Sequence, residues 1–343
     1  MLILSSTIHN LNIMILTNIA KQVVRTMSTF RLALVQLEVN EVKRKNVERA
    51  VSYIFSAKER NADIIALPEC FNSPYGIQYF RKYAESIPDG ETSVALSNAA
   101  KENNIYVVGG TMPEIEGDKL YNTCTIWGPD GTLIAKHRKV HLFDIDIPNK
   151  ITFRESDSLS PGNSLTTFDV KGCKIGIGIC YDIRFEEMAR IYRNKGCQML
   201  IYPAAFNMTT GPLHWSLLQR SRANDNQLYV ACISPARVPS ASYVAWGHTQ
   251  LTNPWGEILY DLETQENMAV TDIASEKQDI FETAWVFFPT FLTFNNKIFV
   301  KRYNLSNKVL VDSQSRKNID LLQVLFFTML RVEFLLDELL LND

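Results

Sequence analysis

Three polar residues stand where apolar strands are expected to end. Cys180 closes the run KIGIGIC ahead of a predicted helix, Glu69 follows the strand DIIAL directly after Pro68, and Lys139 lies in KHRKVHLFDID. A helix N-terminus lowers the pKa of a thiol, and burial raises the pKa of a carboxyl group. Each residue also has an ordinary structural explanation: an inert buried Cys, an exposed Glu, or one member of a solvated charge run.

The three residue types together match the needs of hydrolysis at a carbon–nitrogen bond. A thiolate attacks the carbon, a carboxylate transfers protons, and a cation stabilises the negative charge that develops. Ligands of α/β sheets bind at the carboxyl ends of strands, so positions 69, 139 and 180 are expected to converge although they are far apart in the sequence. The residues therefore predict amide or nitrile hydrolysis with Cys180 as the nucleophile.

Short β-rich runs alternate with helical stretches from Phe30 onward. The predicted strands are FRLALVQL, DIIAL and IYVVGG in the first half, and SLTTFDV, CKIGIGIC, QMLIYP and LYVACIS in the second. Helices are predicted at about 41–60, after a possible Asn40 cap, at about 92–103, at about 185–194, and after Gly211-Pro212.

Each half also contains a predicted hairpin, with turns at GPDG and NPWG. These hairpins add antiparallel strands to both halves, so we expect two sheets packed face to face with helices outside each. The predicted fold class is α/β, a four-layer α/β/β/α sandwich. A single doubly wound sheet is the alternative that βαβ repeats alone would favour.

Four motifs, ALPECF, KVHLFDID, TFRES and GIGICYDIRF, resemble in order the Glu, Lys, second Glu and Cys motifs of the nitrilase superfamily. Within it, FNMTTGPLHW, RSRANDNQ and YVAWGH look most like omega-amidases, which hydrolyse the terminal amide of alpha-ketoglutaramate and alpha-ketosuccinamate. The resemblance runs from about residue 28 to about residue 275. It implies the nitrilase-type sandwich and an omega-amidase that forms a Cys thioester. Another amidase or a carbamoylase of that superfamily, and a catalytically silent interaction protein on the same fold, are the alternatives.

The resemblance also implies a role for each site residue. Cys180 attacks the amide carbon, while Lys139 and the backbone N–H of Tyr181 hold the oxyanion. Glu69 protonates the leaving ammonia and then activates water against the thioester. Glu155, in TFRES, orients Lys139 and the substrate amide.

An omega-amidase must also hold the distal carboxylate of its substrate. Arg184, four residues after Cys180, is the candidate guanidinium, and an ion pair with Asp182 is its alternative structural role. The resemblance places the remaining pocket rim at Tyr75, Phe206, Asn207 and Thr209.

Composition narrows the class of partner. The 343 residues carry 35 Lys and Arg against 37 Asp and Glu, a net charge of −2, which provides no basic surface for nucleic acid. The six cysteines include no Cys-x-x-Cys, as expected for free thiols in the cytoplasm or an organelle matrix. His137 and His141 are spaced i, i+4 but lie between a strand and a loop, so we expect no metal, and no step requires a cofactor.

Both ends depart from the central pattern. Residues 1–26 lack Asp and Glu, which is compatible with a mitochondrial presequence or with an extension upstream of a start at Met27. We expect a hydrolase domain over 27–275 and an atypical tail over 276–343. Charged residues interrupt the apolar run LLQVLFFTMLRVEFLLDELLL, so no membrane span is expected. The resemblance implies a homodimer acting on a small-molecule omega-amide.

Overall fold

The computed structural model describes residues 28–148, 151–275, 291–294 and 297–300. The chain divides into two compact units, 1–282 and 283–343. The described part of the second unit is the antiparallel pair β16 (Phe291–Phe294) and β17 (Lys297–Val300). The predicted extension 1–26 and most of the predicted tail 276–343 lie outside the described residues, and the predicted domain boundaries stay predictions.

The first sheet has the strand order β15-β1-β2-β3-β5-β4, with β6 paired to β5. Its strands are β1 (Ser28–Gln36), β2 (Ile64–Ala66), β3 (Tyr106–Val108), β4 (Met112–Glu116), β5 (Lys119–Trp127), β6 (Leu133–Arg138) and β15 (Asn267–Ser275). The strands β1, β2 and β3 are parallel neighbours. Helices α2 (Lys43–Glu59) and α4 (Glu91–Asn103) supply the connections between them.

The second sheet has the order β14-β13-β12-β11-β10-β9. Its strands are β9 (Thr166–Val170), β10 (Cys173–Ile177), β11 (Met199–Pro203), β12 (Tyr229–Ile233), β13 (Gln250–Thr252) and β14 (Ile258–Asp261). The central strands β10, β11 and β12 are parallel. Helices α5 (Glu186–Asn194) and α6 (Gly211–Asn226) connect them.

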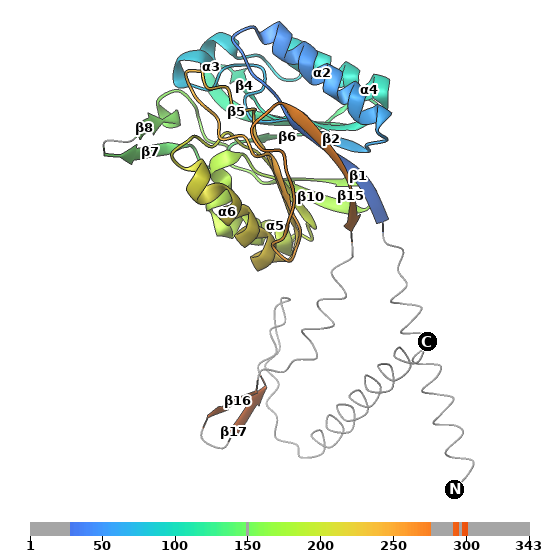
Figure 1. Ribbon diagram of the computed structural model, residues 1–343, viewed down its shortest axis with the longest axis vertical. Coiled ribbons are helices and arrows are strands. Elements are labelled where there is room, and N and C mark those ends of the chain that lie inside the picture. Colours follow the sequence, from blue (N-terminus) through green and yellow to red (C-terminus); the bar gives the residue numbers. More distant parts are fainter. Residues whose placement is uncertain (1–27, 149–150, 276–290, 295–296, 301–343) are drawn as a thin grey trace, which may run out of the picture. The chain divides into compact units, whose positions relative to one another are not determined.

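The two sheets form the inner layers of a sandwich, with α2 and α4 outside the first sheet and α5 and α6 outside the second (Figure 1). Alternation along β1 explains this layering: Leu32 and Leu34 join the core between the sheets, whereas Ala33 and Val35 pack with α2 and α4. The predicted four-layer α/β/β/α sandwich is confirmed. Both predicted hairpins are present as well, β5–β6 around GPDG and β13–β14 around NPWG.

Several elements were not predicted. They are the helix α3 (Ile77–Tyr83), the strand β4, the hairpin of β7 (Asp144–Ile147) with β8 (Ile151–Arg154), and the single turns η1 (Glu155–Asp157) and η2 (Cys180–Arg184). The strand β15 was also missed, and it returns to the first sheet antiparallel to β1. Asn40 is not the cap of α2: its Oδ1 accepts the Val42 N–H at 2.8 Å, which forms a turn, and α2 starts at Lys43. No helix among the described residues is long and apolar enough to cross a membrane.

Candidate active site

Cys180 lies in a sharp turn between β10 and α5. Its φ is +46°, in the left-handed region that costs a non-glycine residue about 1–3 kcal/mol, and such strain concentrates at functional sites. Gly178 permits the approach to the turn, because a Cβ there would stand 2.3 Å from a ring carbon of Tyr202. The thiol is 4% exposed. The sequence GIC thus places a buried sulfur at the beginning of η2.

Glu69 follows the parallel strand β2 and is fully buried. Its Oε1 accepts hydrogen bonds from Asn122 Nδ2 at 2.8 Å and Lys139 Nζ at 3.1 Å. Its Oε2 accepts the backbone N–H of Ala205 at 2.7 Å, from the segment after β11. The carboxylate is therefore held by groups from both sheets.

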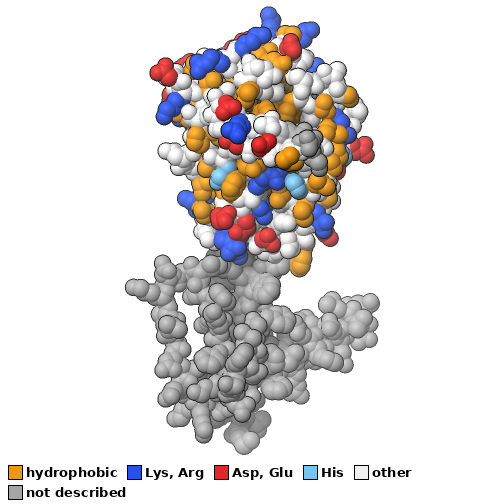
Figure 2. Space-filling view, turned by 90° about the vertical axis from the view of Figure 1, so that its left-hand side faces the viewer, with side chains coloured by type: hydrophobic (Ala, Val, Ile, Leu, Met, Phe, Trp, Pro, Cys, Tyr) orange, Lys and Arg blue, Asp and Glu red, His pale blue; other side chains and the backbone are white. Residues whose placement is uncertain are grey.

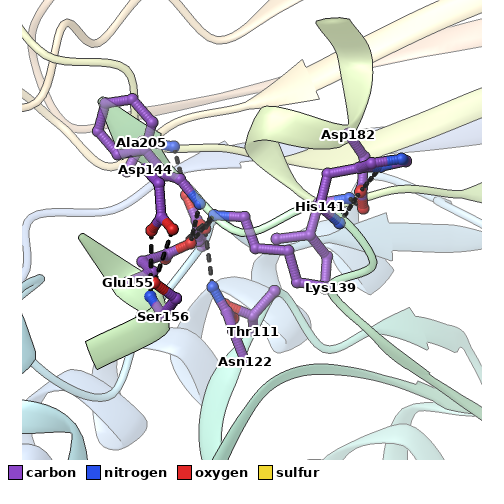
Figure 3. Close-up of polar contacts among 12 residues, drawn as sticks. Thr111, Asn122, Lys139, His141, Asp144, Glu155, Ser156, Asp182 and Ala205 are labelled. Carbon is purple, nitrogen blue, oxygen red and sulfur yellow. Dashed lines mark hydrogen bonds and ion pairs between the residues drawn. The ribbon is translucent and has the colours of Figure 1, made fainter. Parts of the chain in front are cut away.

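Lys139, directly after β6, carries its ammonium group between two carboxylates (Figure 3). Nζ lies 3.1 Å from Glu69 Oε1 and 2.9 Å from Glu155 Oε2, and all three side chains are buried. Glu155, in η1, also accepts hydrogen bonds from Tyr75 OH at 2.7 Å and from the Phe143 N–H at 2.6 Å. Glu69 and Lys139, which were predicted to converge, are thus in contact, and Glu155, which the resemblance places beside Lys139, is its second carboxylate partner.

The electrostatics of this cluster place a carboxylate that can accept a proton, Glu69, beside the Cys180 thiol. Burial raises the pKa of Glu69, the charge of Lys139 opposes that change, and the charge of Glu155 adds to it, while a hydrogen bond with Cys180 lowers the pKa. Burial and the nearby Glu69 raise the pKa of the Cys180 thiol well above its usual range. The resting sulfur is therefore protonated, with a carboxylate beside it that can take the proton.

Lys139 keeps its positive charge in this setting. Burial lowers the pKa of Lys139, but Glu155 and Glu69 raise it by more, so it lies well above the usual range. A fixed cation near Cys180 can stabilise an oxyanion. Tyr181 is the second residue of η2, and the first N–H groups of a helical turn have no partner inside it, so its N–H is suited to the same task.

Arg184 lies at the end of η2 against aromatic rings. The guanidinium carbon is 5.3 Å from the Tyr181 ring centre and 5.1 Å from that of Phe206. Both Nη atoms lie 3.3 Å from His214 Nδ1, and Nε is buried without a hydrogen-bond partner in the described part of the chain. Burial lowers the pKa of Arg184. The alternative ion pair with Asp182 is wrong, because that carboxylate accepts hydrogen bonds from His141 and the Ile179 N–H instead.

Two of the predicted rim residues have a clear structural role. Asn207 Oδ1 accepts the backbone N–H groups of Thr209 at 3.0 Å and Thr210 at 2.9 Å, so it shapes the turn that precedes α6. Phe206 packs edge-on against Trp215, with ring centres 5.2 Å apart. Tyr75 contacts the cluster through its hydrogen bond to Glu155, and Phe206 contacts the Arg184 guanidinium. The hydrogen bonds of Asn207 and Thr209 serve the turn.

Three further residues, which the motifs do not include, support the cluster. Asn122 and the Ala205 N–H hold Glu69, and Tyr243 OH donates to Ala205 O at 2.6 Å. The Tyr243 ring lies 4.6 Å from that of Tyr75. Asn122 had a signal, as a polar residue inside the predicted strand YNTCTIW, while Tyr243 comes from a loop that has no local pattern.

A small cavity of about 50 Å³ opens beside Glu69, lined among others by Tyr75, Ala205 and Tyr243. One face of the molecule shows histidine and Lys or Arg side chains next to apolar side chains (Figure 2). No group of three or more metal-binding side chains occurs among the residues that the structure describes.

A two-sheet sandwich with a buried thiol, two carboxylates and an ammonium group is the architecture of a nitrilase-type hydrolase. The chain belongs to the carbon-nitrogen hydrolase family, whose model matches residues 31–279. It is 59% identical over 251 residues to human omega-amidase NIT2, covering 73% of this chain and 91% of that protein. Omega-amidase NIT2 of Danio rerio is 58% identical over 247 residues, with 72% and 89% covered.

A solved structure agrees with these sequence matches. Saccharomyces cerevisiae Nit3, a member of branch 10 of the nitrilase superfamily, superimposes with a TM-score of 0.70 at 44% identity, covering 77% of this chain and 97% of that one. The protein is accordingly a hydrolase that acts on carbon–nitrogen bonds of small-molecule amides.

Proposed function

We propose that the protein is an omega-amidase that hydrolyses the terminal amide of alpha-ketoglutaramate and alpha-ketosuccinamate to the dicarboxylate and ammonia. The similarity to vertebrate omega-amidases supports the reaction class. The observation that carries the substrate assignment is Arg184, a half-buried guanidinium near Cys180 that has no carboxylate partner among the described residues. An anion stabilises a cation that is partly removed from water, and a substrate with a distal carboxylate supplies one.

In the first half-reaction, Cys180 Sγ forms a bond to the amide carbon. Glu69 takes the thiol proton, and Lys139 with the Tyr181 N–H holds the oxyanion. When the tetrahedral intermediate collapses, the carbon–nitrogen bond breaks and Glu69 delivers the proton to the leaving nitrogen. Ammonia departs and a thioester remains.

In the second half-reaction, Glu69 takes a proton from water, and the oxygen attacks the thioester carbon. The carbon–sulfur bond breaks and the proton returns to sulfur. Glu155 acts on Lys139 throughout, because its 2.9 Å ion pair with Nζ is anchored in turn by Tyr75 OH and the Phe143 N–H. Lys139 therefore keeps one position while charge develops on the substrate.

The test compares alpha-ketoglutaramate with 4-oxopentanamide, an amide that lacks the distal carboxylate, by ammonia release. We expect the wild type to prefer alpha-ketoglutaramate by roughly 100-fold in kcat/KM, the scale of a charge-assisted bidentate hydrogen bond. Arg184→Met should remove this preference, because it lowers kcat/KM for alpha-ketoglutaramate and leaves kcat/KM for 4-oxopentanamide unchanged. Arg190→Met, which removes an exposed arginine of α5 paired with Glu186, is the control and should keep it.

Other outcomes separate the alternatives. Faster turnover of carbamoyl compounds would identify a carbamoylase. A catalytically silent interaction protein would turn over no amide, and electrophilic substrate analogues would fail to label its Cys180 thiol.

We further propose a homodimer in the cytoplasm or the mitochondrial matrix. Leu213 and Leu217, one turn apart on α6, are 66% and 60% exposed, and Trp255 is 66% exposed in the β13–β14 turn. The Arg220 side chain of α6 donates to Gly256 O of that turn, so these apolar side chains belong to neighbouring elements. Light scattering should give a dimer for the wild type and a monomer for Leu213→Glu with Leu217→Glu. Val94→Glu, at a 47% exposed position of α4, should stay dimeric.

Microscopy of fusions that begin at Met1 or at Met27 tests the compartment. Mitochondrial targeting of the longer fusion alone would assign residues 1–26 as a presequence, and a cytoplasmic location of both would assign them as an extension.

A further inference from the structure

The carboxylate of Asp182 joins the turn that carries Cys180 to the loop that follows Lys139. Oδ2 accepts the backbone N–H of Ile179 at 2.8 Å. Oδ1 accepts both the backbone N–H of His141 at 2.8 Å and its ring Nδ1–H at 2.7 Å (Figure 3). One fully buried side chain thus contacts two segments that belong to different sheets.

These contacts lie close in sequence to both reacting groups. Ile179 immediately precedes Cys180, and His141 is two residues after Lys139. The Ile179 N–H bond helps to fix the peptide that enters the left-handed Cys180 conformation. The distance between the thiol and the Lys139 ammonium therefore depends on a connection through Asp182.

Asp182 is charged, and His141 is held firmly against it. Burial raises the pKa of Asp182, but the nearby His137 and the hydrogen bond from His141 outweigh that effect and keep the pKa below its usual range. His137 Nε2 lies 3.6 Å from Oδ2 and is fully buried. The His141 ring stacks on Phe185, with centres 3.6 Å apart and planes 11° apart.

We propose that Asp182 and His141 are positioning residues that hold the Cys180 turn in register with Lys139, so that the oxyanion forms beside the ammonium group. The inference rests on the proposed function of Cys180 and Lys139. Neither His141 nor Asp182 need touch the substrate. They act through the backbone of the turn and the loop, as residues that orient reacting groups do in other enzymes.

Substitutions of His141 separate the hydrogen bond from the ring stacking. Asn places an amide nitrogen where Nδ1 stands, since both branch from Cγ, so His141→Asn keeps the bond to Asp182. His141→Phe keeps the stacking on Phe185 and loses the bond. Asp261→Asn is the matched control, because Asp261 forms a second His–Asp pair. Its Oδ1 lies 2.9 Å from His248 Nδ1, and the pair does not belong to the converging residues.

We expect His141→Phe to lower kcat by about 10- to 100-fold with KM changed less than about twofold, and His141→Asn to stay within about threefold of the wild type. Burial and Glu69 raise the pKa of Cys180 and Lys139 lowers it, so a thiol that is displaced from these surroundings should also react over a different pH range. Iodoacetamide labelling of the Cys180 peptide is followed by mass spectrometry across pH, and the midpoint of its pH profile should shift in His141→Phe alone. Asp261→Asn should match the wild type in both measurements.

Three results would overturn the proposal: full activity of His141→Phe, equal losses in His141→Phe and His141→Asn, or a loss of kcat with an unshifted labelling profile. A protein that fails to hydrolyse any amide would refute the proposed function instead. The labelling profiles of the two variants would still decide whether the Cys180 turn depends on His141.

Discussion

The charge of Glu155 gives the sharpest test of how the buried cluster works. Glu155→Gln keeps the shape of the side chain and removes one negative charge. Its single oxygen can replace only one of the two carboxylate oxygens that accept from Tyr75 OH and from the Phe143 N–H. Glu69 and Glu155 lie 3.1 Å and 2.9 Å from the same Lys139 Nζ, so their nearest oxygens are at most about 6 Å apart. At that separation and an effective dielectric constant of about 20, Coulomb's law gives about 3 kcal/mol, or about two pKa units.

The sign of the change follows from the role of Glu69. It must be ionised to accept the thiol proton, so its protonation sets the acid limb of kcat/KM. Besides burial, the charge of Glu155 raises the pKa of Glu69, so removal of that charge makes ionisation easier. We expect the acid limb of Glu155→Gln to move down by about one to two pH units, although the plateau falls about 10- to 100-fold because Lys139 is held less firmly.

Ammonia release measured from about pH 4 to about pH 9 reads this shift directly. Glu114→Gln is the control, because Glu114 is also a buried carboxylate with cationic partners, Lys136 and Arg138, but it does not contact Lys139. Its acid limb should stay in place. A limb that stays fixed or moves up in Glu155→Gln would refute the electrostatic account of Glu69.

Three further predictions test the individual roles. Cys180→Ser should reduce turnover to background with an unchanged circular dichroism spectrum, because only the thiolate forms the thioester. Appreciable activity of this variant would refute the mechanism. Glu69→Gln and Lys139→Ala should each lower kcat/KM by about 10³-fold or more, because the loss of one member of a catalytic group that works as a unit removes nearly all of the activity. Losses of a few-fold would mean that the roles are misassigned. Chelation with EDTA should leave the activity unchanged, because no step uses a metal, and inactivation that added zinc reverses would contradict this.

The layering of the fold was predictable because its signals are local. A short β-rich apolar run marked β1, and the turns GPDG and NPWG marked the two hairpins. The pairing of β15 with β1 joins residues such as Leu34 and Ala269, which are more than 200 positions apart, and no local pattern encodes it. Short elements such as η1 have too few residues to show a period.

The site was predictable to a similar degree and for a similar reason. Glu69, Lys139, Glu155 and Cys180 carry distinctive motifs, and the ends of strands bring them together. The groups that support them were not predictable, because a backbone N–H such as that of Ala205 has no signature in the sequence. Closeness in sequence did not identify the partner of Asp182. Arg184 is two residues away, but the carboxylate binds His141, which comes from a distant loop.

The most direct test of the account is the covalent intermediate itself. Wild-type protein mixed with alpha-ketoglutaramate, quenched with acid within the first turnover and digested, should yield a Cys180 peptide that carries the acyl group left after ammonia departs. Cys70 is an internal control, because it is a buried thiol directly after Glu69 with a raised pKa. The account predicts the adduct on Cys180 alone. Turnover without an adduct on any peptide, or an adduct on Cys70, would contradict it.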